Sequence, residues 1–93
     1  MNGPMRKIKI RNSFSKDHKR HIKGTPLDGE LRELARLLAS GSPLPEKYRD
    51  HPLKGNLKGL RDCHLRPDVV VIYACSDTMI ELVRVGSHSE LFG

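Results

Sequence analysis

Three histidines stand in the second half of the chain, each flanked by glycine, proline or charged residues: His51, His64 and His88. No single helix or strand could hold all three, so only the fold could bring them together. Histidine titrates near neutral pH and can act as an acid or as a base. Three converging imidazoles in a basic chain would therefore be suited to moving protons around a phosphate group.

Other side chains in the same stretch could assist such chemistry. Cleavage of an RNA strand needs a base for the 2′-OH, an acid for the leaving 5′-oxygen, and cations for the charge that builds up on the phosphate. Asp68 could share in proton transfer, and three basic residues could supply positive charge: Lys54, Arg61 and Arg84. Among the few aromatic residues, Phe92 is the best candidate for stacking on a base. This set of residues requires no cofactor and no metal ion.

Each of these residues also has a structural interpretation. His51 could make a local hydrogen bond in a loop, His64 could be a surface strand residue, and His88 could cap a short helix. A zinc site formed by the three histidines and Asp68 is chemically possible, but no two of the histidines have the close spacing of many zinc sites. Phe92 could instead pack into the core. The residues alone leave these alternatives open.

The composition indicates a single basic domain spanning residues 1–93, with residues 1–4 expected to be a disordered leader. Seventeen lysines and arginines against eleven acidic residues give a net charge of +6, which favours nucleic acid or an acidic protein as partner. Cys63 and Cys75 fall in apolar segments and are expected to be buried free thiols of a cytoplasmic protein. No stretch approaches the ~20 apolar residues of a membrane span, so no membrane partner is expected.

Hydrophobic periodicity predicts the order of the elements. The chain should form a strand at 6–11, helices at 14–23 and 29–40, a long loop at 41–59, and strands at 57–66, 68–75 and 79–85. Ile8 and Ile10 alternate with basic residues and should face the core. The second helix carries a leucine stripe, with Asp28 as its N-cap and Gly41 at its end.

This order predicts an α+β domain of the type β-α-α-β-β-β. Its sheet should be antiparallel, with the two N-terminal helices packed on one face and the other face open for function. Strand alternation places Cys63 toward the core and His64 outward. Arg61 and Arg84 both fall on apolar faces in this scheme, and simple alternation does not explain either one.

Three motifs in this sequence closely resemble those of the YafQ family of toxins: Asp50–Gly55, Arg61–Asp68 and Gly86–Gly93. That family belongs to the RelE/ParE superfamily of type II toxin–antitoxin modules. The resemblance extends from about Arg6 to Gly93 and implies a RelE-like fold, in agreement with the predicted element order. It further implies an endoribonuclease that cuts mRNA, typically on the ribosome, without a metal ion, leaving a 2′,3′-cyclic phosphate.

The resemblance also implies residue roles and partners. The proton transfers would belong to four residues: His51, His64, Asp68 and His88. Arg61 and Arg84 would stabilise phosphate charge, and Phe92 would orient the substrate base. An acidic antitoxin of the ribbon-helix-helix type would cover the basic surface. Operator DNA would be contacted only through the toxin–antitoxin complex.

Acid and base can be assigned only as a hypothesis. We take His88 as the general acid because it lies beside Phe92 in the tail, and His64 or Asp68 as the base, with His51 assisting. Three alternatives differ in outcome. A ParE-like gyrase poison shares the fold but lacks this histidine set, a non-catalytic nucleic-acid binder shows salt-sensitive binding without cleavage, and a metal-dependent nuclease is inactivated by chelator.

Overall fold

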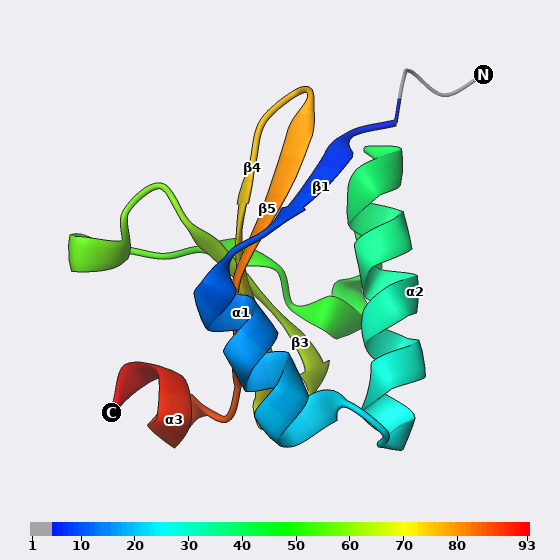
Figure 1. Cartoon of the computed structure of the whole chain (residues 1–93). Coiled ribbons are helices and arrows are strands. Elements are labelled where there is room, and N and C mark those ends of the chain that lie inside the picture. Colours follow the sequence, from blue (N-terminus) through cyan, green and yellow to red (C-terminus); the bar gives the residue numbers. More distant parts are fainter. Residues whose placement is uncertain (1–4) are drawn as a thin grey trace.

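The computed structural model describes residues 5–93, and the prediction for residues 1–4 lies outside this range. One sheet forms the centre of the fold, with helices packed around it on both sides (Figure 1). The elements in chain order are β1 (Lys7–Ile10), α1 (Asn12–Asp17), the π-helical turn η1 (His18–Ile22), α2 (Pro26–Ser40), the 3₁₀ turn η2 (Glu46–Tyr48), β2 (His51–Pro52), the 3₁₀ turn η3 (Gly55–Leu57), β3 (Arg61–Arg66), β4 (Val69–Cys75), β5 (Met79–Gly86) and α3 (His88–Phe92). The predicted α+β class is confirmed. None of the helices in the described range is both long enough and apolar enough to cross a bilayer.

The sheet has five strands in the order β1-β5-β4-β3-β2. The predicted antiparallel meander of β3, β4 and β5 is confirmed. The prediction of an all-antiparallel sheet is wrong, because β1 pairs with β5 in parallel. The short strand β2, within the predicted loop, pairs with the start of β3 and adds the fifth strand. Residue alternation shows which side chains share a face, but it reveals neither the neighbouring strand nor its direction.

The sequence explains both why α2 is a helix, through its leucine stripe, and where this helix begins and ends, through its capping residues. The side chain of Thr25, the N-cap, accepts a hydrogen bond from the Leu27 N–H at 3.2 Å, and Pro26 occupies the first turn. The helix therefore begins three residues before the predicted start. It ends as predicted at Gly41, whose φ of 79° lies in the left-handed region that glycine tolerates.

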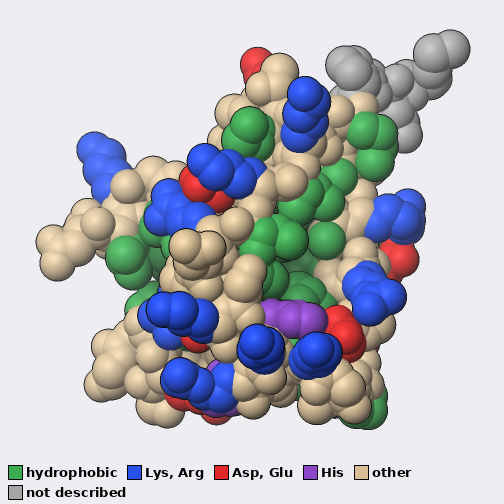
Figure 2. Space-filling view, viewed as in Figure 1, with side chains coloured by type: hydrophobic (Ala, Val, Ile, Leu, Met, Phe, Trp, Pro, Cys, Tyr) green, Lys and Arg blue, Asp and Glu red, His purple; other side chains and the backbone are tan. Residues whose placement is uncertain are grey.

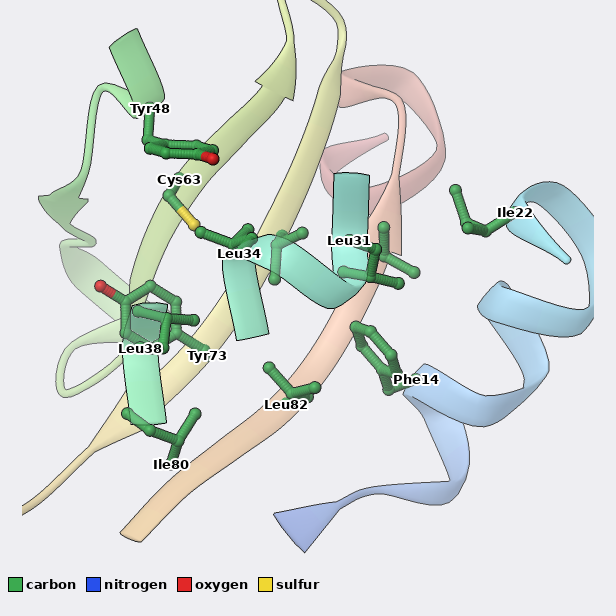
Figure 3. Close-up of a cluster of buried hydrophobic side chains, with 12 residues drawn as sticks. Phe14, Ile22, Leu31, Leu34, Leu38, Tyr48, Cys63, Tyr73, Ile80 and Leu82 are labelled. Atoms are coloured by element: carbon green, nitrogen blue, oxygen red, sulfur yellow. The ribbon is translucent and has the colours of Figure 1, made fainter. Parts of the chain in front are cut away.

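The main core lies between α1, α2 and one face of the sheet (Figure 3). The predicted leucine stripe is buried there, with Leu34 fully enclosed. The opposite face of the sheet was predicted to be open and is instead partly covered. A smaller apolar cluster on that face comprises Val70, Ile72 and Val83, packed against Leu53, Leu60 and Leu91. Strand β4 is therefore buried on both faces, as its continuous apolar sequence predicts.

Two burial predictions are wrong. Ile8 and Ile10 on β1 are 43% and 53% exposed, because β1 is an edge strand and α2 does not close over it. Cys75 is exposed at the end of β4, whereas Cys63 is fully buried as predicted. Alternation correctly groups the two isoleucines on one face, but it does not show whether another element covers that face.

A β-bulge in β5 explains the position of Arg84. Ile72 pairs with Arg84 and Tyr73 pairs with Leu82, so Val83 is one extra residue in the ladder. Val83 packs in the smaller cluster, whereas Leu82 and Val85 on either side of the bulge pack in the main core. The bulge thus restores the apolar face of β5 and leaves Arg84 on the face opposite the main core.

Candidate active site

The fold brings the three predicted histidines together from three different elements. The ring centroids of His51 in β2 and His64 in β3 are 6.4 Å apart, and those of His64 and His88 in α3 are 5.5 Å apart. The ring of Phe92 lies 6.0 Å from that of His88. Because His51 pairs with Asp62, two residues before His64 on the same face of β3, strand pairing alone places the first two histidines side by side.

His51 is held through both ring nitrogens. Its Nδ1 lies 2.9 Å from the carbonyl oxygen of Arg49, which can only accept, so Nδ1 donates. Its Nε2 lies 3.0 Å from Oδ1 of Asp62, a carboxylate only 4% exposed. The two atoms lie at ion-pair distance, although the contact does not have the geometry of a hydrogen bond. His51 is therefore suited to a supporting role.

His64 has a different environment. It lies half-buried on the outward face of β3, as predicted, and among residues 5–93 it makes no hydrogen bond or ion pair. Both of its ring nitrogens are available to a substrate. It is also the central member of the cluster, between His51 and His88.

His88 is oriented by Asp68, a pairing that the sequence analysis did not predict. Oδ1 of Asp68 accepts hydrogen bonds from the His88 ring Nδ1 at 2.8 Å and from its backbone N–H at 3.1 Å. The bond from the ring has the larger effect and the bond from the backbone the smaller one. Together they hold the pKa of Asp68 below its usual value, so the carboxylate stays ionised. With Nδ1 occupied, Nε2 of His88 is the nitrogen left to exchange a proton with a substrate.

Helix α3, which carries His88 and Phe92, is fixed at its start by a capping box. Oγ of Ser87 accepts from the Glu90 N–H, and the Glu90 carboxylate accepts from the Ser87 N–H at 2.8 Å. The other oxygen of Glu90 lies 2.7 Å from Nε2 of His21 in η1. Sequence reasoning missed the contributions of Asp62, His21 and Glu90. Only the last had a readable signal, the Ser-x-x-Glu spacing.

The basic residues predicted to stabilise phosphate charge lie on different faces of the sheet. Arg84 lies on the face of the histidines, and Asp17 binds its Nε at 2.6 Å and its Nη2 at 3.1 Å. Arg61 pairs with Tyr73 on the main-core face and binds Asp50. Burial, with the adjacent Asp50, raises the pKa of Tyr73, so its hydroxyl also donates to Asp50. The structure thus brings Arg84, but not Arg61, to the histidine face. Lys54 is exposed just after β2.

Comparison with known proteins identifies the class to which this fold and site belong. The sequence model of the family described as "Bacterial toxin of type II toxin-antitoxin system, YafQ" matches residues 6–93. The chain therefore belongs to the YafQ family of type II toxin–antitoxin toxins.

Individual relatives support the same assignment. The mRNA interferase toxin YafQ of Escherichia coli strain K12 is 40% identical over 95% of this chain and 97% of its own length. The toxin chain in the crystal structure of the E. coli DinJ-YafQ complex has a TM-score of 0.85 at 40% identity, covering 95% of this chain and 99% of that one. A metal-bound toxin from Helicobacter pylori has a TM-score of 0.84 at 45% identity, covering 95% of this chain and all of that one.

Proposed function

We propose that this toxin is an endoribonuclease that cleaves mRNA by attack of a ribose 2′-OH on the adjacent phosphate. The observation that carries the proposal is the pair of imidazoles of His64 and His88, 5.5 Å apart, each with a ring nitrogen available to substrate. When the scissile phosphate lies against the edges of two such rings, one ring can take the proton of the 2′-OH and the other can protonate the leaving 5′-oxygen. The name of the E. coli relative, an mRNA interferase, supports this reading.

In the proposed reaction, His64 takes the proton of the 2′-OH as the oxygen attacks phosphorus. The bond from phosphorus to the 5′-oxygen then breaks, and Nε2 of His88 gives that oxygen a proton. The products are a 2′,3′-cyclic phosphate and a free 5′-OH. Asp68 is bound to Nδ1 of His88 and is therefore assigned to positioning rather than to proton abstraction.

The remaining residues of the site have supporting roles in this proposal. Two of the guanidinium nitrogens of Arg84 contact Asp17, and its remaining N–H groups can face the negative charge on the non-bridging oxygens of the phosphate. Phe92, 43% exposed, offers a ring on which a base can stack next to His88. No step requires a metal ion. We place the reaction in the cytoplasm, on mRNA held by the ribosome, and we expect the same residues to cleave free RNA as well, only more slowly.

A short single-stranded RNA tests the chemistry directly. We expect cleavage to persist in EDTA and to leave a cyclic phosphate that resists phosphatase until it is opened by acid. A 2′-deoxy substitution at the cleaved nucleotide should abolish the reaction, because it removes the nucleophile. The H. pylori relative is described as metal-bound, so EDTA is the decisive addition. Loss of activity in EDTA, or cleavage of the deoxy substrate, would contradict the mechanism.

We further propose that the cognate antitoxin inserts an acidic, amphipathic segment into a groove between β1, α1 and α2. This antitoxin groove has a volume of about 560 Å³ and an apolar floor that includes Ile8, Ile10 and Leu31. Its rim carries four basic side chains: Lys16, Lys19, Lys23 and Arg32. Figure 2 shows the apolar floor with lysines and arginines around it. The E. coli relative in complex with DinJ supports an antitoxin partner, for which we propose a ribbon-helix-helix part that binds operator DNA.

Replacing Ile10 by glutamate should separate antitoxin binding from RNA cleavage. Ile10 is 53% exposed on the groove floor, so the change should leave the fold intact. It buries a charge against the antitoxin and should weaken binding about 30-fold, the effect of losing a central interface contact. RNA cleavage by the free toxin should be unchanged. Calorimetric titration measures the affinity, with Lys7→Glu on the same strand as the control. Equal affinities for the two variants would place the antitoxin elsewhere.

A further inference from the structure

A second concave surface of the described chain begins at His64 and has no assigned role in the chemistry above. It is a pocket of about 520 Å³, with walls from α2, from η2 and the residue after it, and from the end of β3. His88 and Phe92 do not line it, because they belong to α3, which packs against β5. His64 is therefore shared between two surfaces, with the ring of Phe92 beyond His88 on one side and this pocket on the other.

The pocket combines apolar surface with positive charge. Leu65 and Pro67 supply the apolar part, and the nearly buried ring of Tyr48 lies behind them with the ammonium of Lys47 over it, 5.2 Å from the ring centroid. Lys47 and Arg49 are exposed at the pocket and form no ion pair within the described part of the chain. Arg66 in the same wall is bound to Glu30, with its Nε 2.9 Å from the carboxylate. Glu30 and Glu33 also line the pocket and lie within electrostatic reach of Lys47, but each carboxylate is already bound by an arginine. The lining therefore keeps a net positive charge, with Arg49 free, beside a surface on which a base can lie, the combination that proteins use to hold single-stranded nucleic acid.

Arg49 connects this pocket to the histidines. Its φ of 49° makes it the only non-glycine residue with a positive φ among residues 5–93. Its carbonyl oxygen accepts the hydrogen bond from Nδ1 of His51, while its side chain lines the pocket. The same backbone conformation thus orients one histidine of the cluster and presents a cation to the neighbouring surface.

We propose that this pocket binds one nucleotide of the RNA substrate, the one on the other side of the scissile phosphate from the nucleotide whose base stacks on Phe92. Lys47 and Arg49 contact its phosphate, and its base lies against the apolar wall. The inference rests on the proposed function, because it assumes that His64 and His88 flank the scissile phosphate. The volume falls within the range of about 300–1,000 Å³ that is usual for small-ligand sites.

The test combines two variants with three RNA substrates. The double variant Lys47→Ala/Arg49→Gly removes both cations, and glycine tolerates the positive φ at position 49. The substrates are an intact RNA with one cleavage site and two versions, each lacking the base on one side of that site. On intact RNA we expect the double variant to raise KM about tenfold with little change in kcat, the mark of lost substrate binding. Because the cations seat this nucleotide by its phosphate, removal of the pocket-side base should cost the double variant less than it costs the wild type. Removal of the base on the Phe92 side should in the same way cost Phe92→Ala less than it costs the wild type.

Lys7→Ala, which removes a positive charge from β1, controls for the general attraction between a basic protein and RNA. The proposal is overturned if the double variant behaves like this control, or if it loses sensitivity to the same base as Phe92→Ala. It is also overturned if the double variant binds antitoxin more weakly while its RNA affinity is unchanged. A 2′-O-methyl RNA, which cannot be cleaved, gives the affinity separately. Absence of cleavage by the wild type would contradict the proposed function, whereas unchanged binding of this RNA by the double variant would contradict the pocket.

Discussion

Replacing His64 or His88 by alanine should lower kcat for RNA cleavage by about 10²–10⁴-fold, the usual contribution of a general acid or base. Each variant removes the ring nitrogen that the proposed mechanism uses, while Asp68 and the capping box of α3 remain. Single-turnover cleavage of a short RNA measures the chemical step directly. His51→Ala should cost less, because both nitrogens of His51 are engaged by the protein itself.

The two roles can be distinguished with a substrate whose leaving 5′-oxygen is replaced by sulfur. A thiolate leaves without being protonated, so this substrate should restore activity to the variant that lacks the acid. We expect it to rescue His88→Ala and not His64→Ala. Rescue of His64→Ala instead would reverse the assignment, and equal rescue of both would remove the distinction. Thermal melting of each variant shows whether the fold is retained.

The second large effect concerns stability. Asp17 in α1 is 6% exposed and accepts hydrogen bonds from the guanidinium of Arg84 and from the Val85 N–H at 3.1 Å. Asp17→Ala would leave the Arg84 charge and a buried backbone donor without their partner. We expect a loss of about 2–4 kcal/mol in the free energy of unfolding, measured by urea denaturation. Glu33→Ala breaks the exposed Glu33–Arg36 pair and should cost under about 0.5 kcal/mol.

The contribution of Asp17 should also depend on pH. Burial opposes ionisation of this carboxyl, but the hydrogen bonds from Arg84 and Val85 outweigh it and hold its pKa below the usual value. The stabilisation is therefore fully present above the unfolded pKa of about 3.9 and is lost as the pH falls through the lower folded pKa. The difference in the free energy of unfolding between the wild type and Asp17→Ala should therefore shrink below about pH 4. A difference that stays constant down to pH 2 would show that the carboxylate charge is not the source.

Local sequence patterns predicted which helices and strands form better than they predicted which elements pack or pair with one another. The leucine stripe of α2 and the continuous apolar run of β4 correctly predicted these two elements. The stripe is typical of a helix buried on one face, and the run is typical of a strand buried on both faces. Ile8 and Ile10 were assigned to the right face of β1 but to the wrong environment, since periodicity cannot show whether another element covers a face. The parallel pairing of β1 with β5 had no local signal.

The histidine cluster was predicted from residue types together with the family resemblance, and the structure supplies the reasons for it. Pairing of β2 with β3 could not be read from the loop sequence, yet it sets His51 beside His64. The bulge at Val83 is a tertiary feature that explains why Arg84 breaks the alternation of β5. The same alternation places Arg61 on the main-core face, where Asp50 binds it, away from the predicted phosphate site. The residue roles in catalysis remain predictions.

The parallel pairing of β1 with β5 has a consequence for the order of folding. Strands β3, β4 and β5 are joined by short turns, so their ladder can form early from contacts that are close in sequence. Attachment of β1 and α1 requires contacts such as that of Ser13 with Val83, which are 70 residues apart, and the entropy of closing so long a loop delays them. A late intermediate would therefore contain the strand that carries His64 but no antitoxin groove. An antitoxin that binds this groove would select chains that have completed the last step of folding.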